Sequence, residues 1–186
     1  MTKIILLLFI FFLALSSCKS TSYSPMNYDE QTVFDKQMVI FTDTSESICS
    51  LYNDQKIYGI TAAQLTNCLK NNDTSVVYLW QPRCKRNSCI LLSAAQRYCD
   101  TNNFTLYVIA QYYDMPKMKG QNKGPLPIFV PNHQYYNKDF SDGVVLEFNA
   151  SLSANSKLTK KKYSGNFQIF KGDQLIDIRE NLIPQG

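Results

Sequence analysis

Two continuous apolar runs form the centre of the hydrophobic pattern along the chain. Both runs, Val76–Trp80 and Phe104–Ala110, are rich in β-forming residues and are typical of strands buried on both faces. Between them, apolar positions recur at i, i+3, i+4 and i+7, which predicts a helix that Asn87 or Ser88 caps and that runs through Tyr98. A strand, a helix and a strand with short connections predict a parallel pair and a right-handed crossover.

Further segments on the N-terminal side of these runs complete one half of the expected sheet. The short apolar segments Gln37–Phe41 and Ile57–Ile60 are strand candidates. Thr61 is suited to be the N-cap of a helix over Ala62–Lys70, because its hydroxyl can accept a hydrogen bond from the first turn.

The sequence pattern of the C-terminal third predicts antiparallel strands at one edge of the sheet. Pro125–Pro131 contains a short strand bracketed by prolines, which we expect at a sheet edge or at a strand start. Phe140–Leu152 is a helix candidate, and Phe167–Phe170 with Leu175–Ile178 predicts a hairpin around Gly172. The expected fold class is therefore α/β, a mixed central sheet with a parallel centre and a C-terminal antiparallel hairpin, flanked by helices.

The N-terminal segment has the pattern of an export signal. Lys3 precedes an uninterrupted apolar run, Ile4–Leu15, which as a helix would cover about 18 Å of the ~30 Å that a hydrocarbon core requires. A charged start followed by a short apolar run is typical of a signal peptide.

The residues that close this run, Leu15-Ser16-Ser17-Cys18, resemble the lipobox of bacterial lipoproteins. The resemblance implies cleavage before Cys18 and lipid attachment to that cysteine. The alternative is ordinary secretory cleavage, which leaves Cys18 as a free or disulfide-bonded cysteine. In the lipoprotein class an aspartate after the cysteine often retains the protein in the inner membrane. This chain has Lys19 there, which favours the outer membrane.

We therefore expect a signal peptide over residues 1–17, a lipid-anchored flexible tether over residues 18–32 and one domain over residues 33–186. The formal net charge of +4 is mild, and no basic helix or zinc-finger spacing is present, which argues against a nucleic-acid partner. We expect no cofactor, and a membrane contact through the lipid anchor.

The cysteines indicate most about the chemistry of this chain. Six are present, and with Cys18 lipidated the other five would face an oxidising compartment. Cys49 and Cys68 are candidates for a disulfide that closes a loop of ~20 residues, worth about 3 kcal/mol in the chain-entropy model. Cys99, late in the second predicted helix, is expected to pack in the core.

The segment from residue 76 to 89, VVYLWQPRCKRNSC, resembles the active-site segment of the thioredoxin fold. In that family a buried strand ends in Trp-x-Pro-x-Cys, which Trp80, Pro82 and Cys84 match. The terminal hairpin is similar to the last two strands of the fold. The strand within residues 127–130 resembles an insertion found in the extracytoplasmic branch of the family.

This resemblance implies thiol–disulfide exchange on exported proteins that contain cysteine, with Cys84 as the attacking thiol and Cys89 as the resolving one. Exchange requires an exposed thiol with a lowered pKa. The resemblance implies a helix start next to Cys84, which together with the cations Arg83, Lys85 and Arg86 would supply that shift. We expect Trp80 to be buried beside the cysteines.

Two features depart from the family pattern and keep a redox-inactive alternative open. Cys84 and Cys89 are five residues apart, a rise of ~7.5 Å on a helix, so they can bridge only if Cys84 lies in a loop and the helix starts near Asn87. Residues 164–166 contain no proline where the family has one facing the cysteines. The alternative is a thioredoxin-like binding module with a static Cys84–Cys89 disulfide or two free thiols.

Peroxide reduction and metal delivery are weaker alternatives. The peroxiredoxin signature Pro-x-x-x-Thr/Ser-x-x-Cys is absent around Pro82. Copper-delivering members of the fold add a distant histidine to the two cysteines, and His133 is the one histidine of this chain. We expect His133 to be an exposed loop residue and assign no metal ligands.

Overall fold

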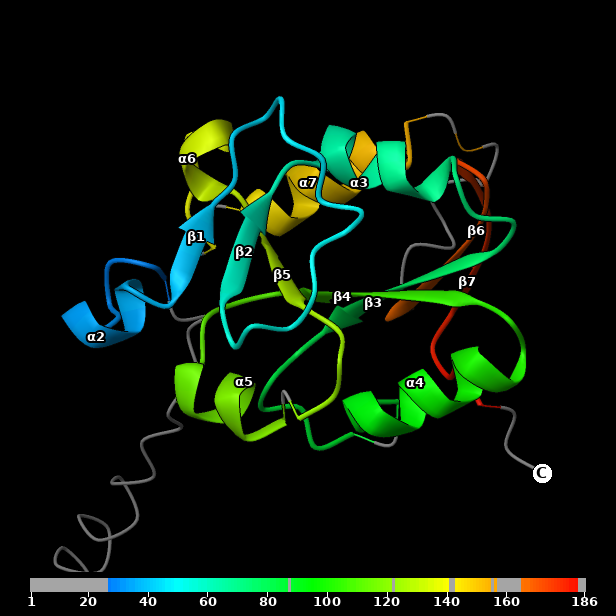
Figure 1. Ribbon diagram of the computed structural model, residues 1–186, viewed down its shortest axis with the longest axis horizontal. Coiled ribbons are helices and arrows are strands. Elements are labelled where there is room, and N and C mark those ends of the chain that lie inside the picture. Colours follow the sequence, from blue (N-terminus) through cyan, green and yellow to red (C-terminus); the bar gives the residue numbers. More distant parts are fainter. Residues whose placement is uncertain are drawn as a thin grey trace, which may run out of the picture.

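The computed structural model describes residues 27–86, 88–121, 123–140, 143–154, 156 and 165–183. The predicted signal peptide and Cys18 lie outside these residues. Within them the chain forms a seven-stranded sheet with helices on both faces (Figure 1). No helix in these ranges has the length and apolar character needed to cross a membrane.

The sheet is parallel over most of its width. Its spatial order is β1 (Val39–Phe41), β2 (Ile57–Ile60), β5 (Ile128–Pro131), β4 (Thr105–Ala110), β3 (Ser75–Trp80), β6 (Phe167–Lys171) and β7 (Gln174–Arg179). The pairings from β1 through β3 are parallel, whereas β3–β6 and β6–β7 are antiparallel. The predicted α/β class, with a parallel centre and an antiparallel C-terminal hairpin, is confirmed.

Six helices are defined in the described ranges, and the four longer ones form the two outer layers. They are α2 (Val33–Lys36), α3 (Ala62–Leu69), α4 (Leu92–Thr101), α5 (Met115–Gln121), α6 (His133–Tyr136) and α7 (Val144–Leu152). Helices α3 and α7 cover one face of the sheet, and α4 and α5 cover the other (Figure 1).

Strand β3 supplies side chains to both hydrophobic cores because successive residues of a strand point to opposite faces. Tyr78 and Trp80 pack in the core that includes Cys99 of α4. Val77 and Leu79 pack in the second core, under α3 and α7. Every residue of β3 is buried, as its continuous apolar run predicts.

Helix α3 confirms the prediction made from Thr61. The Thr61 hydroxyl accepts a hydrogen bond from the Gln64 N–H at 3.2 Å, and the Gln64 side-chain oxygen accepts one from the Thr61 N–H at 2.9 Å. This reciprocal pair is a capping box. A disulfide between Cys49 and Cys68 joins α3 to the preceding segment, with Cα atoms 5.2 Å apart, also as predicted.

One predicted helix start is wrong, and of the two positions expected for the strand bracketed by prolines, the sheet edge is excluded and the strand start holds. Helix α4 begins at Leu92, later than a cap at Asn87 or Ser88 would place it, because the preceding residues are held in a disulfide-closed loop. Strand β5 lies inside the sheet, between β2 and β4, rather than at an edge. The prolines before the strand precede its first residue, and Pro131 is its last residue. At these positions the missing N–H of proline does not interrupt the hydrogen bonds between strands.

Candidate functional site

The Cys84–Cys89 pair forms a disulfide in the connection between β3 and α4, which we call the disulfide loop (residues 81–86 and 88–91). The two Cα atoms are 5.9 Å apart, and both cysteines are half-buried. The loop contains two tight turns, in which the Cys84 N–H donates to the Gln81 carbonyl at 3.0 Å and the Cys89 N–H donates to the Arg86 carbonyl at 2.9 Å. The expectation that this pair bridges from a loop is confirmed.

Residues at the end of β4 hold the first part of the disulfide loop. The Arg83 N–H donates to the Tyr112 hydroxyl at 2.8 Å, and the Arg83 guanidinium pairs with the Asp114 carboxylate. Asp114 is buried, with 1% of its side chain exposed, and it also accepts a hydrogen bond from the Lys117 N–H in the first turn of α5. Burial raises the pKa of Tyr112, so its hydroxyl stays protonated at neutral pH.

Glutamine and tyrosine side chains hold the two ends of the loop to the sheet. The Gln81 side-chain amide donates to the Gln111 side-chain oxygen at 3.2 Å, and the Gln111 amide donates to the Leu79 carbonyl at 2.9 Å. At the other end, the Tyr78 hydroxyl donates to the Ile90 carbonyl at 3.0 Å. Burial raises the pKa of Tyr78 to about 12, so this donor also keeps its proton at neutral pH.

Asn166, just before β6, approaches the disulfide from the other side. Its side-chain amide donates to the Cys89 sulfur at 3.8 Å, and its carbonyl accepts from the Leu79 N–H at 2.8 Å. It belongs to residues 164–166, which by resemblance correspond to the place of a proline in the thioredoxin family. The described residues contain no cis peptide bond.

The three cations of the loop do not act alike. Arg83 is paired with Asp114, which offsets its charge. Lys85 and Arg86 are exposed, and Arg86 also reaches the Gln81 side-chain oxygen at 3.4 Å.

The predicted helix start at Cys84 is wrong. Because the field of a helix end falls off within about one turn, the N-terminus of α4 at Leu92 lies too far along the chain to lower the pKa of the Cys84 thiol. Cys89 is the cysteine closer to that helix end.

The remaining predicted residues have clear positions. Trp80 is 2% exposed and Pro82 is buried, so the expected burial of Trp80 beside the cysteine segment is confirmed. Cys99 is a buried free cysteine, as expected, and burial raises the pKa of its thiol to about 12.

The position of His133 differs from the exposed loop position that we expected. It is half-buried, with its ring 5.0 Å from that of Tyr28 and 4.9 Å from that of Phe41. Burial lowers the pKa of His133. In the part of the chain that the structure describes, no three His, Cys, Asp or Glu side chains are grouped as metal ligands.

The sequence reasoning missed Tyr112, Asp114 and Asn166. A signal for the first two was present, because polar residues that follow a buried parallel strand lie beside those that follow its neighbour. Strands β3 and β4 are such neighbours, and the residues after β4 are Gln111, Tyr112, Tyr113 and Asp114. Comparison of the chain with protein-family models, curated sequences and solved structures found no match.

Proposed function

We propose that this chain is a lipid-anchored extracytoplasmic protein with a thioredoxin-like domain, and that it exchanges thiols and disulfides with exported proteins through Cys84 and Cys89. The observation that carries the proposal is the half-buried, partly accessible disulfide at the carboxyl end of β3, in a loop held by non-covalent contacts. Exchange requires an accessible sulfur and a loop that keeps its place after the bond is broken.

The contacts of the disulfide loop support a redox role over a purely structural one. Tyr112 and Asp114 hold the loop near Cys84, and Tyr78 holds it just beyond Cys89. The covalent bond is therefore one of several restraints. In the chain-entropy model it closes so short a loop that it contributes only about 2 kcal/mol. The reduced loop would retain its other contacts.

One exchange balances without a bound cofactor, once an external thiol reductant has reduced the Cys84–Cys89 disulfide to two thiols. In the reducing direction, the Cys84 thiolate attacks a substrate disulfide, forms a mixed disulfide and releases one substrate thiolate. The Cys89 thiolate then attacks the Cys84 sulfur, which restores the internal disulfide and releases the second substrate thiolate. Lys85 and Arg86 favour the Cys84 thiolate, and the Asn166 amide favours negative charge on the Cys89 sulfur.

Cysteine variants test this proposal. Cys84→Ser should abolish reduction of a model disulfide, whereas Cys89→Ser should accumulate a mixed disulfide, because attack proceeds and resolution does not. The reduction potential of the parent protein should lie above about −300 mV. A lower potential, with no trapped mixed disulfide on Cys89→Ser, would contradict the exchange function.

The second candidate is a redox-inactive thioredoxin-like binding module in which Cys84–Cys89 is structural. Two observations favour it: α4 begins at Leu92, away from Cys84, and Asn166 lies where the family has a proline. This candidate predicts a disulfide that resists dithiothreitol until the domain is unfolded. The same potential measurement and trapping experiment distinguish the two.

The lipid anchor rests on the sequence Leu15-Ser16-Ser17-Cys18 behind an apolar run too short to span a bilayer. Cys18→Ser should release the protein from membranes or stall its processing. Detergent phase partitioning of cell extracts measures this. Processed protein that stays in the detergent phase without Cys18 would contradict the anchor.

A further inference from the structure

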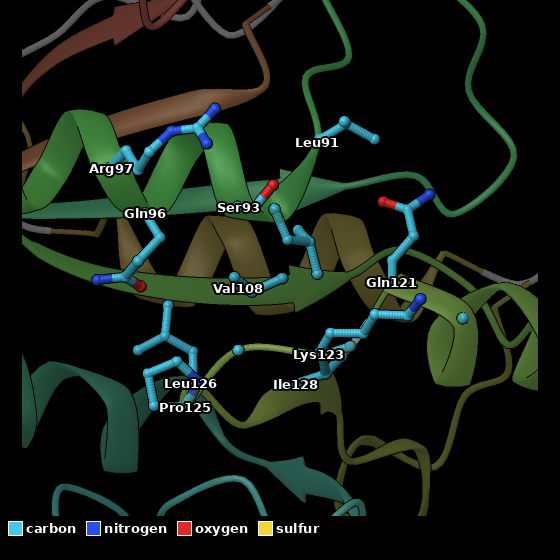
Figure 2. A pocket seen from close by; sticks show the side chains of 13 residues that line it. Leu91, Ser93, Gln96, Arg97, Val108, Gln121, Lys123, Pro125, Leu126 and Ile128 are labelled. Atoms are coloured by element: carbon cyan, nitrogen blue, oxygen red, sulfur yellow. The ribbon is translucent and has the colours of Figure 1, made fainter.

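A cavity of about 470 Å³ opens on the α4–α5 face of the sheet, outside the disulfide site (Figure 2). Helix α4 forms one side, and the end of α5 with the segment leading into β5 forms the other. Its floor is apolar: Val108 of β4 and Ile128 of β5 are each 1% exposed, and Leu126 lies beside them. The volume is in the range of small-molecule sites.

The polar surroundings of the cavity favour an anion. Among the described residues that line it, the charged ones are Arg97 and Lys123, both cations. Leu92 and Ser93, the first two residues of α4, also line it. Their N–H groups have no intrahelical partner, and the N-cap residue, Leu91, has no side chain that can accept from them. The positive end of α4 is therefore open to an anionic ligand.

Gln96, one turn further along α4, adds an unused acceptor. Its side-chain nitrogen donates to the Asp100 carboxylate at 2.5 Å, which fixes the orientation of the amide. Gln96 lines the same cavity, and its side-chain oxygen is buried without a hydrogen-bond partner. In Figure 2 the Gln96 side chain extends from α4 toward the side lined by Leu126. A buried acceptor without a donor is costly, and a ligand hydroxyl or amide N–H would satisfy it.

We propose that this cavity binds a small amphipathic carboxylate, with its apolar chain on Val108, Leu126 and Ile128 and its carboxylate at the first turn of α4. Lys123 contributes the countercharge. A hydroxyl or amide N–H on the chain donates to the Gln96 side-chain oxygen. The cavity adjoins the disulfide loop at Leu91 but is lined by neither Cys84 nor Cys89, and neither proposal depends on the other.

Binding of decanoate tests the proposal. The protein is used from residue 18 onward with Cys18→Ser, and decanoate is titrated below its micellar concentration by calorimetry, with 1-decanol and decyltrimethylammonium as matched neutral and cationic probes. Decanoate should bind one to one and more tightly than the other two. 3-Hydroxydecanoate should bind several-fold more tightly still, through Gln96. Equal affinity for the three head groups, or no saturable decanoate binding, would overturn the proposal.

Gly120 provides a matched pair of cavity variants. It lines the cavity on α5, and a Cβ placed there meets no atom within 4 Å. Gly120→Phe should lower decanoate affinity at least tenfold by filling the space, whereas Gly120→Ala should retain binding and also favour the helix. Thermal unfolding of both variants checks that the domain is intact. Unchanged affinity in a folded Gly120→Phe protein would place the ligand elsewhere.

Lys123→Glu separates the contribution of the charge to binding from that of the apolar contact. This variant should lower decanoate affinity about fivefold, as for a partly exposed ion pair, and leave 1-decanol affinity unchanged. Gln96→Leu should remove the preference for 3-hydroxydecanoate over decanoate. A Lys123→Glu protein that binds decanoate as the parent does would remove the assigned countercharge and contradict the carboxylate orientation.

Discussion

The side-chain amide of Asn166 donates to the Cys89 sulfur across 3.8 Å and links the start of β6 to the disulfide loop. The Asn166 carbonyl is held at the same time by the Leu79 N–H of β3. A donor at this position stabilises a thiolate more than a thiol.

We therefore predict that Asn166→Ala raises the pKa of the Cys89 thiol in the reduced protein. The variant should also make the disulfide harder to reduce, since the thiolate product loses a donor. Alkylation rate against pH, on a Cys84→Ser background so that only Cys89 reports from this site, measures the pKa. Asn166→Asp, which lacks the amide donor and adds negative charge, should raise the pKa further. An unchanged pKa in both variants would show that this contact has no chemical effect.

Much of the fold follows from local sequence pattern. Strands β3 and β4 are continuous apolar runs buried on both faces, and α3 begins at a capping box that Thr61 and Gln64 specify. The terminal hairpin turns at Gly172, whose φ of 55° suits glycine. In each case the signal in the sequence lies within a few neighbouring residues, and for this reason the sequence was sufficient.

The errors come from contacts that the hydrophobic pattern does not reveal. The start of α4 is set by the cross-link between Cys84 and Cys89, which holds the residues before the helix in turns. The place of β5 depends on pairing with β2 and β4, and the prolines at its ends resemble those of an edge strand when only the local sequence is considered. The Arg83–Asp114 and Asn166–Cys89 contacts join residues far apart in the chain, which periodicity does not reveal.

Asp114→Asn should loosen the disulfide loop. The Asp114 side chain is 1% exposed and pairs with Arg83, so removal of its charge should lower the free energy of unfolding by about 1–3 kcal/mol. Dithiothreitol should also reduce Cys84–Cys89 faster in this variant. Urea unfolding and reduction kinetics are the measurements. The control is Asp173→Asn, at an exposed pair with Lys70, which should change stability by less than about 0.5 kcal/mol.

The two disulfides should differ in their contribution to stability. Cys49 and Cys68 are 19 residues apart, and Cys84 and Cys89 are 5 apart. The chain-entropy model assigns about 3 kcal/mol to the first and about 2 kcal/mol to the second. The cost of Cys49→Ala/Cys68→Ala should rise further, because Cys68 is fully buried and its loss leaves a cavity.

Urea unfolding of both double variants under oxidising conditions measures this difference. The Cys84→Ala/Cys89→Ala protein should be the more stable of the two and should keep its folded-state spectrum. A larger loss from the Cys84–Cys89 pair would mean that this disulfide is the main restraint on its loop. That result would favour the redox-inactive binding module.

The raised pKa of Tyr78 predicts how the stability of the domain changes at high pH. Burial raises the pKa of Tyr78 from 10.0 to about 12 in the folded state, and the side chain is fully buried. A tyrosine that holds its proton more tightly when folded contributes stability that is fully present below pH 10. This contribution is lost as the pH rises from 10 through 12, because only the unfolded chain releases the proton. Tyr58 contributes stability with the same dependence on pH, since burial also raises its pKa to about 12.

Tyr78→Phe should therefore have two effects that can be separated by pH. At pH 7 it should cost about 1 kcal/mol through the lost hydrogen bond to the Ile90 carbonyl. Between pH 10 and 12 it should lose less stability than the parent, because the proton of Tyr78 no longer contributes. Urea unfolding across this range measures both effects, and Tyr135→Phe, at an exposed site, should match the parent at pH 7. If Tyr78→Phe and the parent lose stability in parallel up to pH 12, the Tyr78 hydroxyl does not hold its proton as the buried contact requires.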